Sequence, residues 1–281
     1  MAELVATLGV PHTPLLWELM RNDIPDDLAA VGEHFERFRR ILEEARPDVL
    51  VMIASDHFRQ LLTSNMPAFM IGKASWNRCT HPNEERMFAL PRCGVPGHPG
   101  LARRLLGGRE LPSGFDFAFS DEPWLDHAFV VPLLYLRPRL DLPVVPIFTN
   151  ANAPPIPSAR RFAQVGDHVR RTILEWDADV RVAVVGSGHL AVELGGPRQF
   201  GGASPDPEFD RAAVSWIEAG DVDAAIEGAT FDRMFQAGNL TFQFLNLVSC
   251  LAVAGGRPPS VAAGVECRFG AEPFIAWEGE G

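Results

Sequence analysis

The stretch Asp48–Phe58, with the sequence DVLVMIASDHF, decides the predicted fold. Val49 to Ala54 form an unbroken run of apolar or small residues, which is the pattern of a strand buried on both faces. The run ends in Ser55, Asp56 and His57, so an imidazole follows the carboxyl end of this strand. Ligand sites in open α/β sheets form at that edge, although the same residues alone also fit a simple turn that contains a histidine.

The residues around this strand predict a sheet with helices on its faces. Glu3 to Val10 is a short strand pattern, and Asp26 to Ala45 carries apolar residues at helical spacing among charges. Because that helix leads directly into the strand at Val49, the three segments form a β-α-β unit. Further strands are expected at 115–119, 142–149, 180–185, 262–269 and 273–276, with helices at 100–106, 158–176, 207–219, 222–227, 231–236 and 240–254, and short strands and loops across 65–96.

No internal repeat or Pro/Gly/Ser-rich linker divides the 281 residues. We therefore predict a single domain, residues 1–281, with an α/β fold in which helices flank a central mixed sheet. The active site is expected at the carboxyl ends of the strands.

Composition excludes several classes of function. With 36 acidic and 25 basic residues, the formal net charge of -11 argues against a surface for nucleic acid or an anionic membrane. The four cysteines have no paired spacing and are expected to be reduced thiols. We found no basic leader and no apolar run of roughly 18 residues, so we expect a cytoplasmic protein without a membrane span.

Four histidines are predicted to meet at one edge of the sheet. His57 is joined by His12 in the turn PHTP, by His127 beside Asp126 at a helix start, and by His189 in the turn GSGH. Neutral imidazole is the commonest protein ligand for Zn, Fe and Ni, and two histidines with one carboxylate are typical of non-haem Fe(II) oxygen chemistry. The spacing alone therefore predicts a metal-dependent enzyme and leaves the metal open.

At this point the sequence resembles the class III extradiol ring-cleavage dioxygenases, the group of the protocatechuate 4,5-dioxygenase beta subunit. The matching segments occur in family order over nearly the whole chain: GVPHTP at 9–14, SDH at 55–57, LDHAF at 125–129 with VPL at 131–133, VVPIFTN at 144–150, GSG at 186–188, GPR at 196–198, EFD at 208–210 and AGN at 237–239.

The resemblance implies a reaction and a set of site residues. In the family, the histidines that match His12 and His57 hold Fe(II) together with a glutamate from a late helix. A catechol or aminophenol ring then opens next to its hydroxyl groups with O2. The histidine that matches His127 lines the site, either as a residue that supports the metal ligands or as one that handles protons, and a further histidine, in the GGxSH motif, acts as acid and base.

This chain departs from the family pattern at two of these positions. Gln243 stands at the position of the third ligand, and its neutral amide should hold Fe(II) less tightly than a carboxylate. Val192 stands where the acid/base histidine is expected, and His189 lies three residues earlier. Either His189 takes over that role, or the proton transfer has been lost or reassigned to His127. Glu193 is the nearest carboxylate that could substitute, although a solvated loop charge is its expected role.

These departures leave three hypotheses. The first is an Fe(II)-dependent extradiol-type dioxygenase that uses a small aromatic substrate and O2. The second is a metal-poor, non-catalytic paralogue that serves as a partner subunit or a small-molecule binding protein, and the third is a Zn-dependent hydrolase. Arg198 is a candidate for binding a substrate carboxylate, with a packing or surface ion-pair role equally open. We expect a homodimer or a subunit of a heteromeric dioxygenase.

Overall fold

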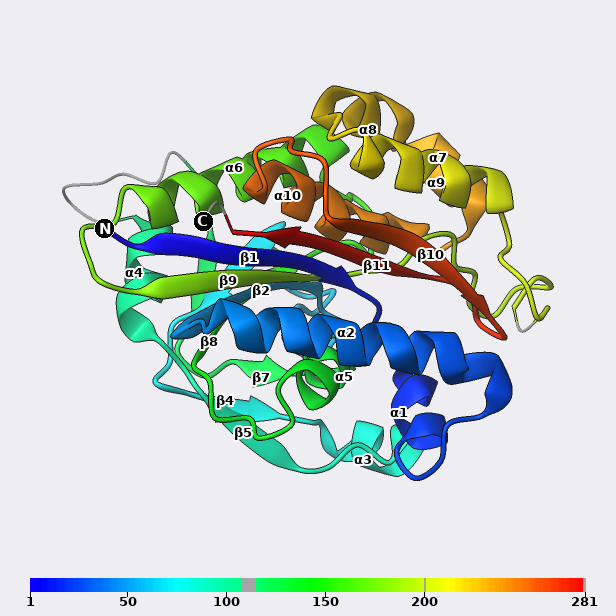
Figure 1. The fold of residues 1–281 in the computed structure, drawn as a ribbon, viewed down its shortest axis with the longest axis horizontal. Helices are drawn as coiled ribbons and strands as arrows, with labels where there is room; N and C mark the ends of the chain where they lie inside the picture. Colours follow the sequence, from blue (N-terminus) through cyan, green and yellow to red (C-terminus); the bar gives the residue numbers. More distant parts are fainter. Residues whose placement is uncertain (108–114, 200, 280–281) are drawn as a thin grey trace.

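A mixed sheet of eight strands runs through the computed structural model, which describes residues 1–107, 115–199 and 201–279 (Figure 1). The strand order is β10-β11-β1-β9-β2-β8-β3-β6. The central strands β1, β9, β2 and β8 are parallel, whereas β11 and β3 join them in antiparallel pairs. The strands of this sheet are β1 Glu3–Val10, β2 Val49–Ser55, β3 Phe69–Gly72, β6 Ala118–Ser120, β8 Val144–Thr149, β9 Arg181–Ser187, β10 Val261–Cys267 and β11 Gly270–Glu278. The fold class predicted from the sequence is confirmed.

Helices cover both faces of the sheet, which is why every residue of β2 and β8 is buried. One hydrophobic cluster contains side chains of α2 and α5, and the other contains those of α6 and α10. Figure 1 shows α2 and α5 on one side of the strands and α6 and α10 on the other. The helices are α1 Pro14–Met20, η1 Asp26–Leu28, α2 Ala29–Ala45, α3 Pro82–Phe88, α4 Pro99–Leu106, α5 His127–Leu136, α6 Ala159–Leu174, α7 Pro207–Glu218, α8 Val222–Gly228, α9 Phe231–Ala237, η2 Thr241–Phe244 and α10 Leu245–Val253, where η marks a 3-10 helix.

A small second sheet lies in the segment that was predicted as short strands and loops. Its order is β5-β4-β7, with strands β4 Trp76–Cys79, β5 Cys93–Pro96 and β7 Trp124–Leu125. The connection from β4 to β5 contains α3, a helix that the sequence analysis did not predict. Its short apolar piece at 87–90 resembles a strand, but Pro82 at the first helical position and Glu84 two residues later begin a helix.

Two other predicted elements differ in extent from those observed. The strand expected at 115–119 forms only at Ala118–Ser120, because only residues 118–120 pair with β3. The long apolar helix expected at 240–254 is divided into η2 and α10. The tighter 3-10 turn contains Gln243, so the division falls at a candidate site residue.

The ends of three parallel strands lie level with one another. Ser187 at the end of β9 pairs in register with Val10 of β1 on one side and with Ala54 of β2 on the other. The turns after these strands therefore leave the sheet at the same edge and at the same height. None of the helices in the described part of the chain is long and apolar enough to cross a membrane.

Candidate metal centre and active site

The level strand ends bring three imidazoles to one place. His12 follows β1, His57 follows β2 and His189 follows β9. The ring centroid of His12 lies 5.4 Å from that of His57 and 4.2 Å from that of His189. His12 and His189 are buried, and His57 is only partly exposed.

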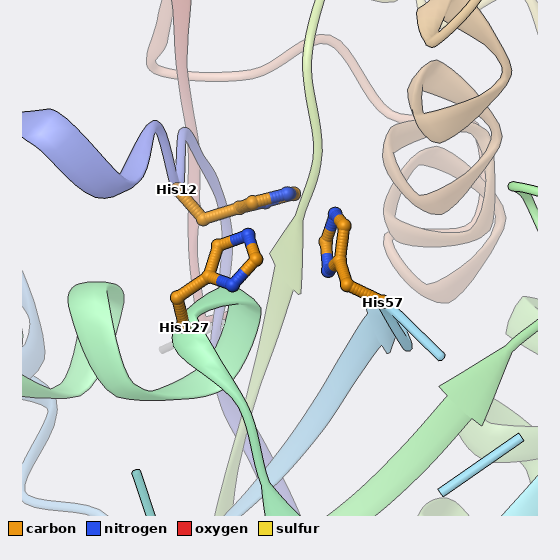
Figure 2. Close-up of side chains that lie close together, drawn as sticks. All are labelled: His12, His57 and His127. Atoms are coloured by element: carbon orange, nitrogen blue, oxygen red, sulfur yellow. The ribbon is translucent and has the colours of Figure 1, made fainter. Parts of the chain in front are cut away.

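His127, the first residue of α5, lies close to the same three imidazoles. Asp126 caps this helix by accepting a hydrogen bond from the backbone N–H of Ala128 at 3.0 Å. The ring of His127 lies 4.1 Å from that of His57 and 5.8 Å from that of His12. Figure 2 shows His12, His57 and His127 turned toward a common centre, and one ring nitrogen of each lies within 4.8 Å of the others.

Hydrogen bonds to one ring nitrogen orient both predicted metal ligands. His57 Nδ1 lies 3.0 Å from Asp126 Oδ2, and the backbone N–H of His57 donates to the same oxygen at 2.8 Å. His12 Nδ1 lies 2.8 Å from Ser187 Oγ, while His12 Nε2 is buried without a hydrogen-bond partner. A ligating histidine ordinarily has its second nitrogen fixed by a carboxylate or another polar group, and the bonds to Asp126 and Ser187 match that pattern.

The surroundings of His12 and His127 favour the neutral form of these two rings. Burial, reinforced by the nearby imidazoles of His189, His57 and His127, lowers the pKa of His12 well below its ordinary value. Burial and the proximity of His57 likewise lower the pKa of His127. Burial opposes ionisation of Asp126, but His57 and His127 outweigh it and hold the Asp126 pKa at about 2. Neutral imidazole is the form that binds a metal ion, so the protonation states suit a metal site.

Gln243 lies beside the two predicted histidine ligands. Its Nε2 is 3.0 Å from His57 Nε2 and 2.8 Å from Asn152 Oδ1, and its Oε1 is buried without a partner. Gly188 permits this packing, since a Cβ there would lie 2.5 Å from the backbone oxygen of Gln243. A glycine is therefore needed at position 188 because the backbone of Gln243 comes so close, and not only because the chain turns there.

The donor set fits a divalent transition-metal ion. His12 Nε2 and Gln243 Oε1 are both buried without a hydrogen-bond partner, and each could be a metal ligand. Unpaired buried polar atoms are costly, and a bound cation would satisfy both. Imidazole nitrogens with an oxygen ligand suit iron and zinc, but the amide of Gln243 cancels no charge.

The remaining predicted site residues lie in different surroundings. His189 Nδ1 is buried without a hydrogen bond, and its nearest carboxylate oxygen, on Glu272, is 3.8 Å away. Arg198 donates from Nε to Glu193 at 2.7 Å and from Nη1 to the carbonyls of Pro205 and Gln236 at 3.2 Å each. The Glu193 side chain is 10% exposed and ion-paired, so it is not the solvated loop charge that we expected.

Glu84 is a buried carboxylate at the site that the sequence analysis missed. It is fully buried on α3, and its Oε1 accepts hydrogen bonds from the Nδ1 of His127 at 2.8 Å and from the backbone N–H of His127 at 3.3 Å. Pro82 followed by two glutamates is typical of a helix start, where acidic side chains are ordinarily solvated. The sequence therefore held no signal that this carboxylate turns inward.

The sequence analysis also missed a network of buried polar side chains that is centred on Asn246. Asn246 on α10 donates to Ser55 Oγ at 3.0 Å and to the carbonyl of Ser187 at 2.8 Å, and it accepts from Thr149 Oγ1 at 2.9 Å. It thereby connects the ends of β2, β8 and β9. A buried amide with several satisfied hydrogen bonds fixes the relative positions of the turns above it.

Comparisons with known proteins show what the whole chain is similar to. The chain is 32% identical over 250 residues to a 2,3-dihydroxyphenylpropionate/2,3-dihydroxicinnamic acid 1,2-dioxygenase of Rhodococcus sp, with 86% of this chain and 74% of that protein covered. A protein of the same name from Cupriavidus necator is 28% identical over 269 residues, with 81% of each covered. For other relatives the covered share is smaller, such as 56% of the Rhodococcus jostii protein.

A solved structure and a family profile complete the comparison. An uncharacterized protein from Escherichia coli K12 superposes with a TM-score of 0.61 at 17% identity, covering 97% of this chain and 99% of the other, which shows a shared fold. The profile described as the catalytic LigB subunit of aromatic ring-opening dioxygenase matches residues 6–268. The chain therefore belongs to the LigB family of aromatic ring-opening dioxygenase subunits.

Proposed function

We propose that this protein is a non-haem Fe(II)-dependent extradiol dioxygenase that opens a catecholic or aminophenolic ring with O2. The observation that carries the proposal is the group formed by His12, His57 and His127, in which one nitrogen of each ring lies within 4.8 Å of the others. His12 contributes a buried Nε2 that has no other partner. Membership of a family of ring-opening dioxygenases supports the same reaction.

In this proposal His12 and His57 hold the metal through Nε2, and Gln243 supplies its Oε1 as a weaker third ligand. Ser187 and Asp126 fix the two rings by their Nδ1 atoms, which leaves Nε2 of His12 without a partner and Nε2 of His57 beside the amide of Gln243. Bound Fe(II) would supply the redox coupling between the diol and O2 that no side chain provides.

His127 is the proposed acid and base. Its Nδ1 is held by Glu84 at 2.8 Å, which leaves Nε2 free to take a proton from a substrate hydroxyl. Glu84 would stabilise the imidazolium that forms, since its charge is buried beside the ring. His189, whose ring centroid lies 4.2 Å from that of His12, is the second candidate for proton transfer. A neutral resting His127 is consistent with its lowered pKa.

The test is anaerobic loading with Fe(II), followed by O2 uptake with a panel of catechols and aminophenols. We expect stoichiometric O2 uptake and a yellow ring-opened product. His12→Ala should lose both, because it removes a metal ligand, while a surface variant such as Arg139→Ala should retain both. The proposal fails if the loaded protein neither consumes O2 nor forms a coloured product with any member of the panel.

Gln243 favours one alternative, the metal-poor, non-catalytic paralogue that acts as a partner subunit or a small-molecule binding protein. The loss of a carboxylate ligand and the valine at position 192 both weaken the catalytic machinery. Metal analysis of the isolated protein and of Gln243→Glu distinguishes the two. Metal only in the variant supports the alternative, whereas iron in both supports the dioxygenase. Zinc with hydrolytic activity would instead support the hydrolase hypothesis.

A further inference from the structure

Arg59 is an arginine beside the histidine cluster whose charged group is left without a hydrogen bond. It lies two residues after His57, and its side chain is 30% exposed. Its Nε is buried and has no hydrogen-bond partner, and the guanidinium makes no hydrogen bond to any part of the described chain. Guanidinium carries five N–H donors, so a mostly buried one is ordinarily paired.

The nearest carboxylate does not satisfy these donors. Glu84 Oε1 lies 4.0 Å from Arg59 Nε, which is beyond hydrogen-bond distance. Both oxygens of Glu84 are engaged elsewhere, Oε1 by His127 at 2.8 Å and Oε2 by the backbone N–H of His81 at 3.2 Å. Arg59 is therefore close to the proposed acid/base histidine, but its donors remain available.

The surroundings of Arg59 contain another unmet donor. The indole Nε1 of Trp124 is buried without a partner, and Trp124 stacks on His81 with 4.3 Å between ring centroids. The loop that carries Arg59 is fixed to this strand, because the backbone N–H of Trp124 donates to Gln60 Oε1 at 2.8 Å. Two side-chain nitrogens without a hydrogen-bond partner, Arg59 Nε and Trp124 Nε1, thus lie in two segments that are fixed to each other.

Arg198, by contrast, is engaged by the chain through all three guanidinium nitrogens. Nε and Nη2 contact Glu193, and Nη1 donates to the carbonyls of Pro205 and Gln236, the latter in α9. Arg59 is accordingly the better candidate for recognising a negatively charged substituent on the ring.

We propose that Arg59 determines specificity by binding a negatively charged substituent of the ring close to the metal centre. The inference rests on the proposed function and assigns a residue to the recognition of its substrate. Arginine binds carboxylate through two parallel N–H donors, and a partly buried position strengthens that bond. In the named relatives the substrate is 2,3-dihydroxyphenylpropionate, which carries such a group.

The test compares two ligands that share a ring and differ only in charge. Anaerobic equilibrium binding is measured with 2,3-dihydroxyphenylpropionate and with 3-propylcatechol, whose side chain has the same length and no carboxylate. For Arg59→Ala we expect the dissociation constant of the acidic ligand to rise at least about tenfold, or about 1.4 kcal/mol, and that of the neutral ligand to change less than about twofold. For Arg59→Lys, the dissociation constant of the acidic ligand should lie between those of the wild type and Arg59→Ala. Lysine keeps the positive charge but cannot donate two parallel hydrogen bonds to a carboxylate.

Three further measurements separate the possible outcomes. Arg139→Ala, an exposed arginine in the turn before β8, should bind both ligands as the wild type does. A selective loss in Arg198→Ala, with none in Arg59→Ala, would overturn the proposal in favour of the outer loops, and equal losses of both ligands in Arg59→Ala would overturn it as well. Binding of 3-phenylpropionate, which has no diol, is measured with metal-free protein. Its dependence on Arg59 would uphold the binding role of this residue even if the protein opened no ring.

Discussion

The turns after β2 and β9 are built alike but orient their histidines differently. Asp56 accepts backbone hydrogen bonds from Arg59 at 2.8 Å and from Leu61 at 2.9 Å, and Asp210 accepts one from Ala191 at 2.7 Å. Burial raises the pKa of each aspartate to about 6. Each turn is thus held by one buried carboxyl group.

The two turns differ in the contacts that their histidine rings make. His57 Nδ1 has Asp126 Oδ2 at 3.0 Å, whereas His189 Nδ1 has no hydrogen bond and lies 3.8 Å from the nearest oxygen of Glu272. A firmly held backbone therefore does not by itself orient an imidazole. A polar group in hydrogen-bond contact with the ring is also needed, and of these two turns only the one after β2 has it, through Asp126.

The largest expected effect is on Fe(II) affinity, which should depend on the histidine of the β2 turn and not on that of the β9 turn. His57→Ala should raise the dissociation constant for Fe(II) by more than about 100-fold, since losing a ligand exceeds the 10- to 100-fold effect of losing an outer partner. His189→Ala should change it less than about threefold. Metal titration under anaerobic conditions measures both, with thermal unfolding as the control for folding. Equal losses in the two variants would mean that His189 is also a ligand.

A smaller effect is expected from the carboxylate that orients His57. Asp126→Asn keeps an oxygen that can cap Ala128, so α5 should still begin at the same residue. The variant removes the buried charge beside His57, and we expect Fe(II) affinity to fall about tenfold or more. The same titration provides the measurement. With its one oxygen on Ala128, the asparagine presents an NH2 group to His57 in place of the acceptor Oδ2, so an unchanged affinity would show that neither this acceptor nor the charge is needed to orient the ring.

The third prediction concerns the stability of the folded protein, not metal affinity, and tests the β9 turn. The folded-state pKa of Asp210 is raised from 3.8 to about 6, so its contribution to stability is fully present below pH 3.8 and is lost as the pH rises through 6. Asp210→Asn removes this titration while retaining an oxygen for the N–H of Ala191. The wild type should therefore lose roughly 3 kcal/mol at most relative to the variant between pH 4 and pH 7.

Chemical denaturation at several pH values measures this difference. A variant whose stability follows the same pH curve as the wild type would show that the carboxyl group of Asp210 is ionised at no cost in the folded protein.

Much of the site was predictable from local patterns. The apolar run of β2 and the histidine after it are adjacent in sequence, and the same holds for His12 after β1 and His189 after β9. Parallel strands end at one edge, so their turns were expected to meet there. The approach of His127 to this edge was expected from its place at a helix start.

The partners of these side chains were less predictable, because they come from distant segments. His12 Nδ1 meets Ser187 across 175 residues, and His127 meets Glu84 across 43 residues. Nothing in the local sequence distinguishes a glutamate that turns inward on α3 from one that is solvated. The division of the helix expected at 240–254 was missed for a similar reason, since its apolar residues are buried in either conformation.

By itself, the sequence determined the α/β sheet, the family and the four histidines at its rim, because strand burial and turn position follow from residues next to one another. The tertiary structure alone decided which rings have a carboxylate in contact and which arginine lacks hydrogen bonds. Arg198 is hydrogen-bonded to Glu193 and Gln236, whereas Arg59 Nε has no partner, although the two look equally available in the sequence. Hydrogen-bond partners depend on where separate segments meet in space, and only the folded chain brings them together.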